Sequence, residues 1–261
     1  QLRMNFADID AQLSLRSDDN EAYGTKETGG LALGYSFDNS HRIRASYGTA
    51  FRAPTFNNLY YPASTPTSFR GNPDLKPEQS ETFELGASGN YEKWFWDLAV
   101  YQMDVEDLII NEKINGASTP VNVNKARIRG TELALGYEHN DWRTAIALTY
   151  MDPEDRETGK QLRRLTKQTA RFDLDKTIGN FVIGGSVIAE GDRYDDAANK
   201  NKLSGFATLD LRAGWKFTPN WSTRLTLANV LDKEYSTAIK SKDLNYIAAG
   251  RTGMMTLRYD L

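Results

Sequence analysis

The residue types that carry most enzyme chemistry are scarce in this 261-residue chain. It contains no cysteine, which excludes disulfides, thiolate metal sites and cysteine nucleophiles. The only histidines, His41 and His139, fall in segments expected to be short turns, and neither has a metal-ligand partner at suitable spacing. No Gly-x-Ser-x-Gly elbow and no phosphate-binding glycine loop is present. The sequence therefore predicts a protein that is not an enzyme.

Two acidic clusters offer oxygen atoms of the kind that calcium binds. One is the Asp-Asp-Asn-Glu segment 18–21, and the other is Asp192 with Asp195 and Asp196. Both lie in segments expected to be loops. We interpret them as solvated loop charge, so no cofactor is expected, and calcium is the alternative.

Arg163 is a candidate for hydrogen bonding to a polar ligand. It is an even number of residues from Lys167 and from Arg171, a spacing that we call the same strand parity. In a β-strand this spacing predicts that all three side chains lie on one face, just below a loop at 152–161. A planar guanidinium suits amide and phosphate oxygens. The alternative is an arginine of the wall that a neighbouring carboxylate neutralises.

A second candidate group combines aromatic and amide side chains in the longest expected loop. It consists of Phe56, Asn57, Tyr60 and Tyr61. These side chains are suited to stacking on a flat ligand, although packing within the loop explains them as well.

The elements that must position these groups are β-strands, because apolar residues alternate with polar or small ones. This pattern runs through residues 142–150, 207–217, 221–227 and 255–259. No apolar stretch approaches the roughly 18 residues of a transmembrane helix. A membrane β-barrel remains compatible with the mean hydropathy of −0.59, because only every second residue of its strands faces lipid.

Turn residues divide the chain into about twelve strands that are joined alternately by short and long connections. The short ones are expected at 38–40, 92–93, 138–140, 178–180 and 218–220, and the long ones at 53–80, 111–124, 152–161, 192–202 and 236–249, with a compact loop near 17–26. All five tryptophans lie within a few residues of a short turn, which predicts an aromatic belt at one membrane boundary. The alternative is a soluble β-sandwich or β-solenoid with an aromatic core.

The opposite strand faces carry charges of both signs, which favours an inner wall that is hydrated or packed against a polar plug. The predicted wall residues are Arg42, Arg44, Asp97, Glu132, Arg171, Asp173, Asp210, Arg212, Lys216, Arg224 and Arg258. With 32 basic and 35 acidic residues, the formal net charge of −3 gives no indication of nucleic-acid binding.

Three ordered segments resemble TonB-dependent outer-membrane receptors. They are the loop sequences within 47–78, the strand sequence Lys-Ala-Arg-Ile-Arg-Gly-Thr-Glu at 125–132, and Leu-Ala-Asn-Val-Leu-Asp-Lys-Glu-Tyr at 227–235. Within the family, Leu59–Pro62 and the Leu-Arg-Arg sequence at 162–164 look most like the receptors that transport vitamin B12 (cobalamin).

The resemblance implies a transmembrane antiparallel β-barrel of 22 strands around an N-terminal plug, in the outer membrane of a Gram-negative bacterium. Residues 1–261 are then expected to form the C-terminal portion of the wall, with the plug domain absent. Short turns are expected at the periplasmic side. Arg163, Tyr60, Tyr61 and Asn57 become candidate ligand-binding residues in the extracellular loops and upper lumen, and any calcium site is expected in the other half.

The expected function is the wall of a cobalamin importer. TonB would act through the missing N-terminal segment, and outer-membrane lipid and lipopolysaccharide would surround the wall. Two other ligand classes, siderophores and haem, are alternatives. A passive channel formed by a closed twelve-stranded barrel of this chain alone is a further alternative, as is docking of phage or bacteriocins on the loops.

Overall fold

The computed structural model describes residues 1–21, 23–241 and 244–260 and consists almost entirely of strands. The elements are β1 (Leu2–Phe6), β2 (Ile9–Asn20), β3 (Gly24–Ser36), β4 (His41–Arg52), α1 (Phe56–Tyr60), β5 (Glu78–Asn90), β6 (Trp94–Ile114), β7 (Ala117–His139), β8 (Trp142–Asp155), β9 (Gln168–Ile178), β10 (Phe181–Glu190), β11 (Arg193–Tyr194), β12 (Lys202–Leu203), β13 (Phe206–Lys216), β14 (Trp221–Ala228), β15 (Ser236–Ser241), β16 (Leu244–Ile247) and β17 (Thr252–Tyr259). Within these described ranges, no helix is long and apolar enough to cross a membrane.

Thirteen strands form one sheet in the order β1-β2-β3-β4-β5-β6-β7-β8-β9-β10-β13-β14-β17, which confirms the all-β fold. The prediction of about twelve strands missed one turn. Ala7, with a φ of 50°, begins a tight turn between β1 and β2. Thirteen is an odd number, so the first and last strands of an alternating antiparallel sheet run in the same direction.

The predicted long loop at 111–124 is wrong, because β6 and β7 continue as an extended hairpin to a two-residue turn. Asn115 and Gly116 occupy this turn with φ values of 51° and 86°. An Asn-Gly pair favours a type I′ turn, in which both residues need positive φ. The dipeptide therefore carried the signal that the loop prediction overlooked.

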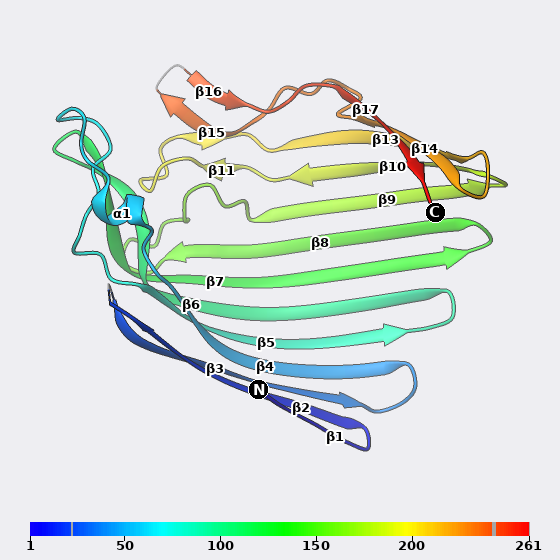
Figure 1. The fold of residues 1–261 in the computed structure, drawn as a ribbon, viewed down its shortest axis with the longest axis horizontal. Helices are drawn as coiled ribbons and strands as arrows, with labels where there is room; N and C mark the ends of the chain where they lie inside the picture. The colour runs from blue at the N-terminus through cyan, green and yellow to red at the C-terminus, as the bar shows by residue number, and fades with distance from the viewer. Residues whose placement is uncertain (22, 242–243, 261) are drawn as a thin grey trace. The chain divides into compact units, whose positions relative to one another are not determined.

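The contacts divide the chain into two compact units. Unit 1 contains residues 1–86, 100–129 and 153–160, and unit 2 contains 87–99, 130–152 and 161–261. Within unit 2, the β9–β10 and β13–β14 turns lie at one end of the strands, and β11, β15 and β16 belong to the long connections at the other end (Figure 1).

The apolar face of unit 2 is exposed, not buried in a second layer. Trp142 and Leu148 each keep 42% of their surface exposed, and Leu225 keeps 46%. A dry two-layer interior would have buried these side chains. The structure therefore supports the predicted alternation between an apolar outer face and a polar inner face.

The short-turn end of unit 2 carries a continuous row of aromatic rings across β10, β13, β14 and β17. The ring centroids of Phe181 and Trp215 are 5.5 Å apart, and those of Trp221 and Tyr259 are 4.8 Å apart. Phe217 joins the two pairs, at 5.2 Å from Trp215 and 6.4 Å from Trp221. This row is the predicted aromatic belt.

Candidate ligand-binding site

On the polar face of unit 2, an ion pair joins the two outer strands of three neighbours. It passes over a glycine of the middle strand. Asp175 of β9, Gly184 of β10 and Arg212 of β13 are direct register partners. Arg212 donates two hydrogen bonds of 2.6 Å to the Asp175 carboxylate, from Nε and Nη2. A Cβ on Gly184 would collide with this carboxylate, so the glycine allows the pair to lie flat on the wall.

Unit 1 repeats this arrangement. Arg42 of β4 reaches across Gly34 of β3 to Asp10 of β2, with 2.6 Å between Nη1 and Oδ1. The register places Gly34 between Asp10 and Arg44, and Arg44 in turn contacts Glu84 at 3.2 Å. Wall charges in both units therefore neutralise one another, as expected for a hydrated inner face.

A cavity of about 1330 Å³ lies on the polar face of unit 2, towards its short-turn end. Its lining includes the Asp175–Arg212 pair together with Lys216, Arg224 and Arg258. These three predicted wall residues therefore do face the inner side, on the neighbouring strands β13, β14 and β17.

The aromatic-amide group of unit 1 is exposed on the short helix α1. Phe56 is 80% exposed, Tyr60 59% and Tyr61 46%, and Asn57 is also exposed. Thr55 caps the helix, since its hydroxyl accepts a hydrogen bond from the Asn58 N–H. The structure therefore brings all four predicted residues together with their side chains accessible.

The loop that carries α1 is anchored by the residues of the first family-like motif. A Cβ on Gly71 would lie 2.6 Å from the Tyr61 nitrogen, so only glycine fits there. Asn72 donates from its side chain to the Pro120 carbonyl, at 3.1 Å. Asn122 accepts from the Lys76 N–H at 2.9 Å. This motif therefore holds the loop against β7.

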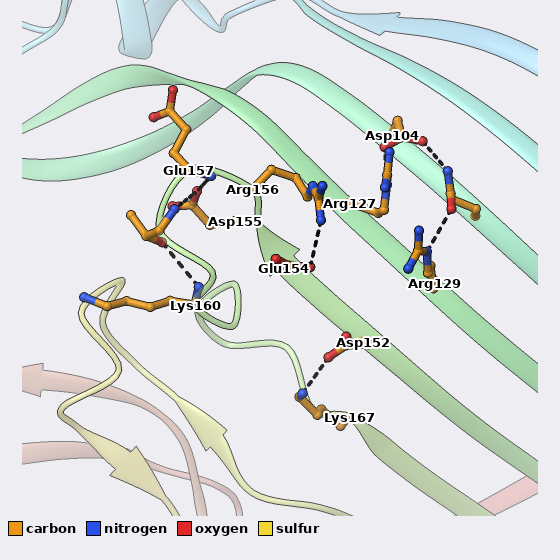
Figure 2. Close-up of polar contacts among 12 residues, drawn as sticks. Asp104, Arg127, Arg129, Asp152, Glu154, Asp155, Arg156, Glu157, Lys160 and Lys167 are labelled. Carbon is orange, nitrogen blue, oxygen red and sulfur yellow. Dashed lines mark hydrogen bonds and ion pairs between the residues drawn. The ribbon is translucent and has the colours of Figure 1, made fainter.

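Arg163 does not lie on a strand face, because β9 begins only at Gln168. It lies in a turn of the β8–β9 connection and is half-buried. The strand-parity prediction for Arg163 is therefore wrong, although its role in ligand binding stays a prediction. Lys167, predicted on the same face, pairs with Asp152 at 2.5 Å (Figure 2).

The neighbouring Arg164 makes an ion pair with Asp195. Its Nε lies 2.7 Å from Asp195 Oδ1, and the same oxygen accepts the Ile239 N–H at 3.0 Å. Burial acts to raise the pKa of Asp195, but the hydrogen bonds from Arg164 and Ile239, with the positive charge of Arg163 nearby, outweigh it. The pKa of Asp195 consequently lies below its ordinary value.

Several other acidic loop residues also make ion pairs or hydrogen bonds, and the exposed side chains of Arg16 and Lys202 keep two of these pairs in contact with solvent. Asp192 pairs with Lys202, and Asp196 accepts the N–H groups of Lys200 and Asn201. Asp18 pairs with Arg16 in unit 1. In the part of the chain that the structure describes, no group of three or more His, Cys, Asp or Glu could hold a metal ion.

The motif at 227–235 ends a strand. Asn229, with a φ of 49°, donates from its N–H to the Asp210 carboxylate at 2.7 Å and exchanges two hydrogen bonds of 2.9 Å with Lys233. Asp232 accepts the Arg251 N–H at 2.8 Å. These residues shape the chain where β14 leaves the sheet, and their role is architectural.

Sequence analysis missed an aromatic pair near the long connections of unit 2. The rings of Phe206 and Tyr235 stack at 3.7 Å, and the buried Arg193 lies 5.9 Å from the Phe206 ring. Tyr235 closes the family-like motif, which was the available signal. Phe206 shares the strand parity of the wall residues Asp210 and Arg212.

A polar cavity of about 470 Å³ lies at the loop end of unit 1. Its lining consists of Glu106, Asp107, Lys125, Arg156 and Glu157. Figure 2 shows the polar contacts around it, in which Arg156 pairs with Glu154 at 3.4 Å and Arg127 with Asp104 at 2.6 Å. These cations are therefore already bound to carboxylates.

The histidine expected in the first short turn makes local contacts. His41 is held in its turn by Asp38, with Nδ1 2.8 Å from Oδ2, and stacks on Phe37. In unit 1, the exposed rings of Phe56, Tyr60 and Tyr61 offer stacking surface. In unit 2, Arg164 keeps 46% of its side-chain surface in solvent while it pairs with Asp195. Exposed aromatic rings suit flat ligands, and guanidinium groups suit ligands with amide or phosphate oxygens.

Comparison with known proteins agrees with the sheet topology. The family model described as "TonB dependent receptor-like, beta-barrel" matches residues 1–230. Two vitamin B12 transporters, from Photobacterium profundum and Vibrio vulnificus, are 36% and 32% identical over 85% and 96% of this chain. The matched part spans only 36% and 40% of those proteins.

Solved structures share the fold. The ferric enterobactin receptor mutant from Pseudomonas aeruginosa has a TM-score of 0.79 at 21% identity, covering 97% of this chain and 43% of that one. The siderophore receptor PirA from Acinetobacter baumannii has a TM-score of 0.78 at 22% identity, covering 97% and 44%. Proteins of this family are transporters of the Gram-negative outer membrane and not enzymes. The chain therefore belongs to the TonB-dependent receptor β-barrel family.

Proposed function

We propose that this chain forms part of the wall and the ligand-binding loops of a receptor that takes up cobalamin with energy supplied through TonB. The observation that carries the proposal is the 36% and 32% identity with two vitamin B12 transporters over most of this chain. The siderophore receptors of similar structure are only 21–22% identical, a level that reports the fold.

The exposed chemistry of the loops supports this ligand class. Cobalamin combines a flat ring system with amide and phosphate oxygens. In unit 1, Tyr60 at the end of α1 and the adjacent Tyr61 supply flat apolar surface. In unit 2, considered by itself, the guanidinium of Arg163 is of the kind that binds amide and phosphate oxygens. In this arrangement the long connections face the cell exterior, and the aromatic belt marks the periplasmic boundary of the membrane.

Binding of cyanocobalamin to the complete receptor tests the proposal. Arg163→Ala should weaken binding roughly 10- to 150-fold, because one charge-assisted hydrogen bond contributes about 1.5–3 kcal/mol. Arg156→Ala is the matched control, since Arg156 pairs with Glu154 in the same connection. A change of less than about threefold for Arg163→Ala would remove this residue from the site. Binding of a ferric siderophore or haem, with none of cyanocobalamin, would identify a different ligand class.

A further inference from the structure

Three loops of unit 2 that are distant in sequence meet at the carboxylate of Asp195. Arg164 contributes a 2.7 Å contact from the β8–β9 connection, 31 residues away in sequence. Ile239 of β15 contributes its N–H at 3.0 Å, 44 residues away. The Asp195 N–H in turn donates to the Asn201 carbonyl within its own loop, at 2.9 Å.

Additional hydrogen bonds join the β8–β9 connection to the loop that carries Asp195. The Arg164 N–H donates to the Tyr194 carbonyl at 2.6 Å. Gln161 and Asn199 exchange two hydrogen bonds of 2.9 Å, so the arginine-bearing segment 161–167 contacts the 195–201 loop at two places. These contacts fix the backbone on both sides of Arg163.

The Asp195 side chain is only 13% exposed, whereas Arg164 keeps 46% of its side-chain surface in solvent. A carboxylate at this degree of burial needs its hydrogen-bond donors, because an unpaired buried charge is costly. The adjacent Asp196 differs from Asp195 in its hydrogen-bond partners. Its carboxylate accepts the N–H groups of Lys200 and Asn201, both of its own loop.

We propose that Asp195 is a positioning residue, which joins the three loops and thereby fixes the segment that presents Arg163 to the ligand. Removal of its negative charge leaves Arg164 without its ionic partner and weakens the acceptor for the Ile239 N–H. The segment 161–167 then loses its fixed position, and ligand binding pays the cost of ordering it. The ligand-binding part of this inference rests on the proposed function.

Residues 1–261 contain no cysteine, so a single cysteine introduced among them can carry a spin label once any cysteine elsewhere in the complete receptor is replaced by serine. Ala198, in the 195–201 loop, and Asn245, in β16, are both exposed and suit this purpose. In the complete receptor, Asp195→Asn should increase label mobility at both positions and weaken cyanocobalamin binding at least fivefold. The melting temperature should stay within a few degrees, because the strands of the wall are untouched.

The control is Asp192→Asn. Asp192 lies in the same connection but pairs with Lys202, at the base of the same loop. This variant should leave label mobility at Asn245 and cyanocobalamin affinity unchanged. Arg164→Ala should reproduce the increased mobility at position 198 and the weaker cyanocobalamin binding, and the double variant should be no worse than Asp195→Asn alone, because Asp195→Asn already removes the ionic contact with Arg164.

Unchanged label mobility in Asp195→Asn would overturn the inference, as would increased mobility with unchanged cyanocobalamin affinity. Additive effects of the two variants would also overturn it. If the unsubstituted receptor binds no cyanocobalamin, the proposed function fails. The label mobilities then still decide whether Asp195 joins the loops.

Discussion

Substitution of Gly184 by alanine tests whether glycines allow ion pairs to lie flat across the inner wall. In the structure, Asp175 and Arg212 meet over Gly184 through two hydrogen bonds of 2.6 Å. A Cβ at position 184 would collide with the Asp175 carboxylate and would lie 2.6 Å from the Leu174 carbonyl oxygen. The carboxylate must move away, and the backbones of β9 and β10 must separate slightly.

The expected loss of stability follows from three contributions. Both charged side chains are 24% exposed, so loss of their pairing should cost about 1.5–2 kcal/mol, the lower part of the range for charged hydrogen bonds. The strained contact with the Leu174 carbonyl adds about 1 kcal/mol. Replacement of glycine by alanine lowers the conformational entropy of the unfolded chain, and this offsets roughly 0.4–1 kcal/mol of the lost stability. We therefore expect a net destabilisation of about 2 kcal/mol.

Gly214→Ala is the matched control on the adjacent strand. A Cβ at Gly214 would meet its nearest atom, the Thr223 carbonyl oxygen, at 3.8 Å, which is ordinary contact. Urea unfolding of the complete receptor in detergent, followed by tryptophan fluorescence, should show a lower midpoint for Gly184→Ala at unchanged slope. Gly214→Ala should stay within about 0.5 kcal/mol of the unsubstituted protein. Equal stability of the two variants would refute the reasoning.

Two other predictions follow from the loops and the aromatic belt. The lowered pKa of Asp195 means that its contribution to loop order is complete above an ordinary carboxyl pKa of about 3.9 and is lost as the pH falls through the folded-state value. Mobility of a label at position 198 should therefore be constant from pH 8 to 5 and rise below about pH 4, and Asp195→Asn should show no such rise. Brominated lipids should quench Trp215 and Trp221 most strongly when the bromine lies near the headgroups, and strongest quenching at the bilayer centre would contradict the belt.

The strands were predictable because successive side chains of each strand face the membrane and the lumen in turn. Apolar and polar residues therefore alternate along the sequence. Trp142, Leu148 and Leu225 alternate with polar neighbours, and the structure leaves them exposed on one face. The Asn115-Gly116 dipeptide indicates a tight hairpin turn, but the many polar residues of 111–124 led to the prediction of a long loop instead. The turn at Ala7 carried almost none, because alanine rarely adopts a φ of 50° and the sheet alone holds it there.

The loops could not be predicted in the same way, because strand parity has meaning only while the chain remains in a strand. Between Asp155 and Gln168 the chain leaves the sheet, so the spacing of Arg163, Lys167 and Arg171 no longer places them on one face. Contacts outside any strand ladder fix this segment instead, and several of them join residues 31 or more positions apart, such as Arg164 and Asp195. Local sequence contains no record of such partners. Under the proposed function, we therefore expect ligand affinity to change with substitutions in paired loop residues such as Asp195 and Arg164, as well as with substitutions of Arg163 itself.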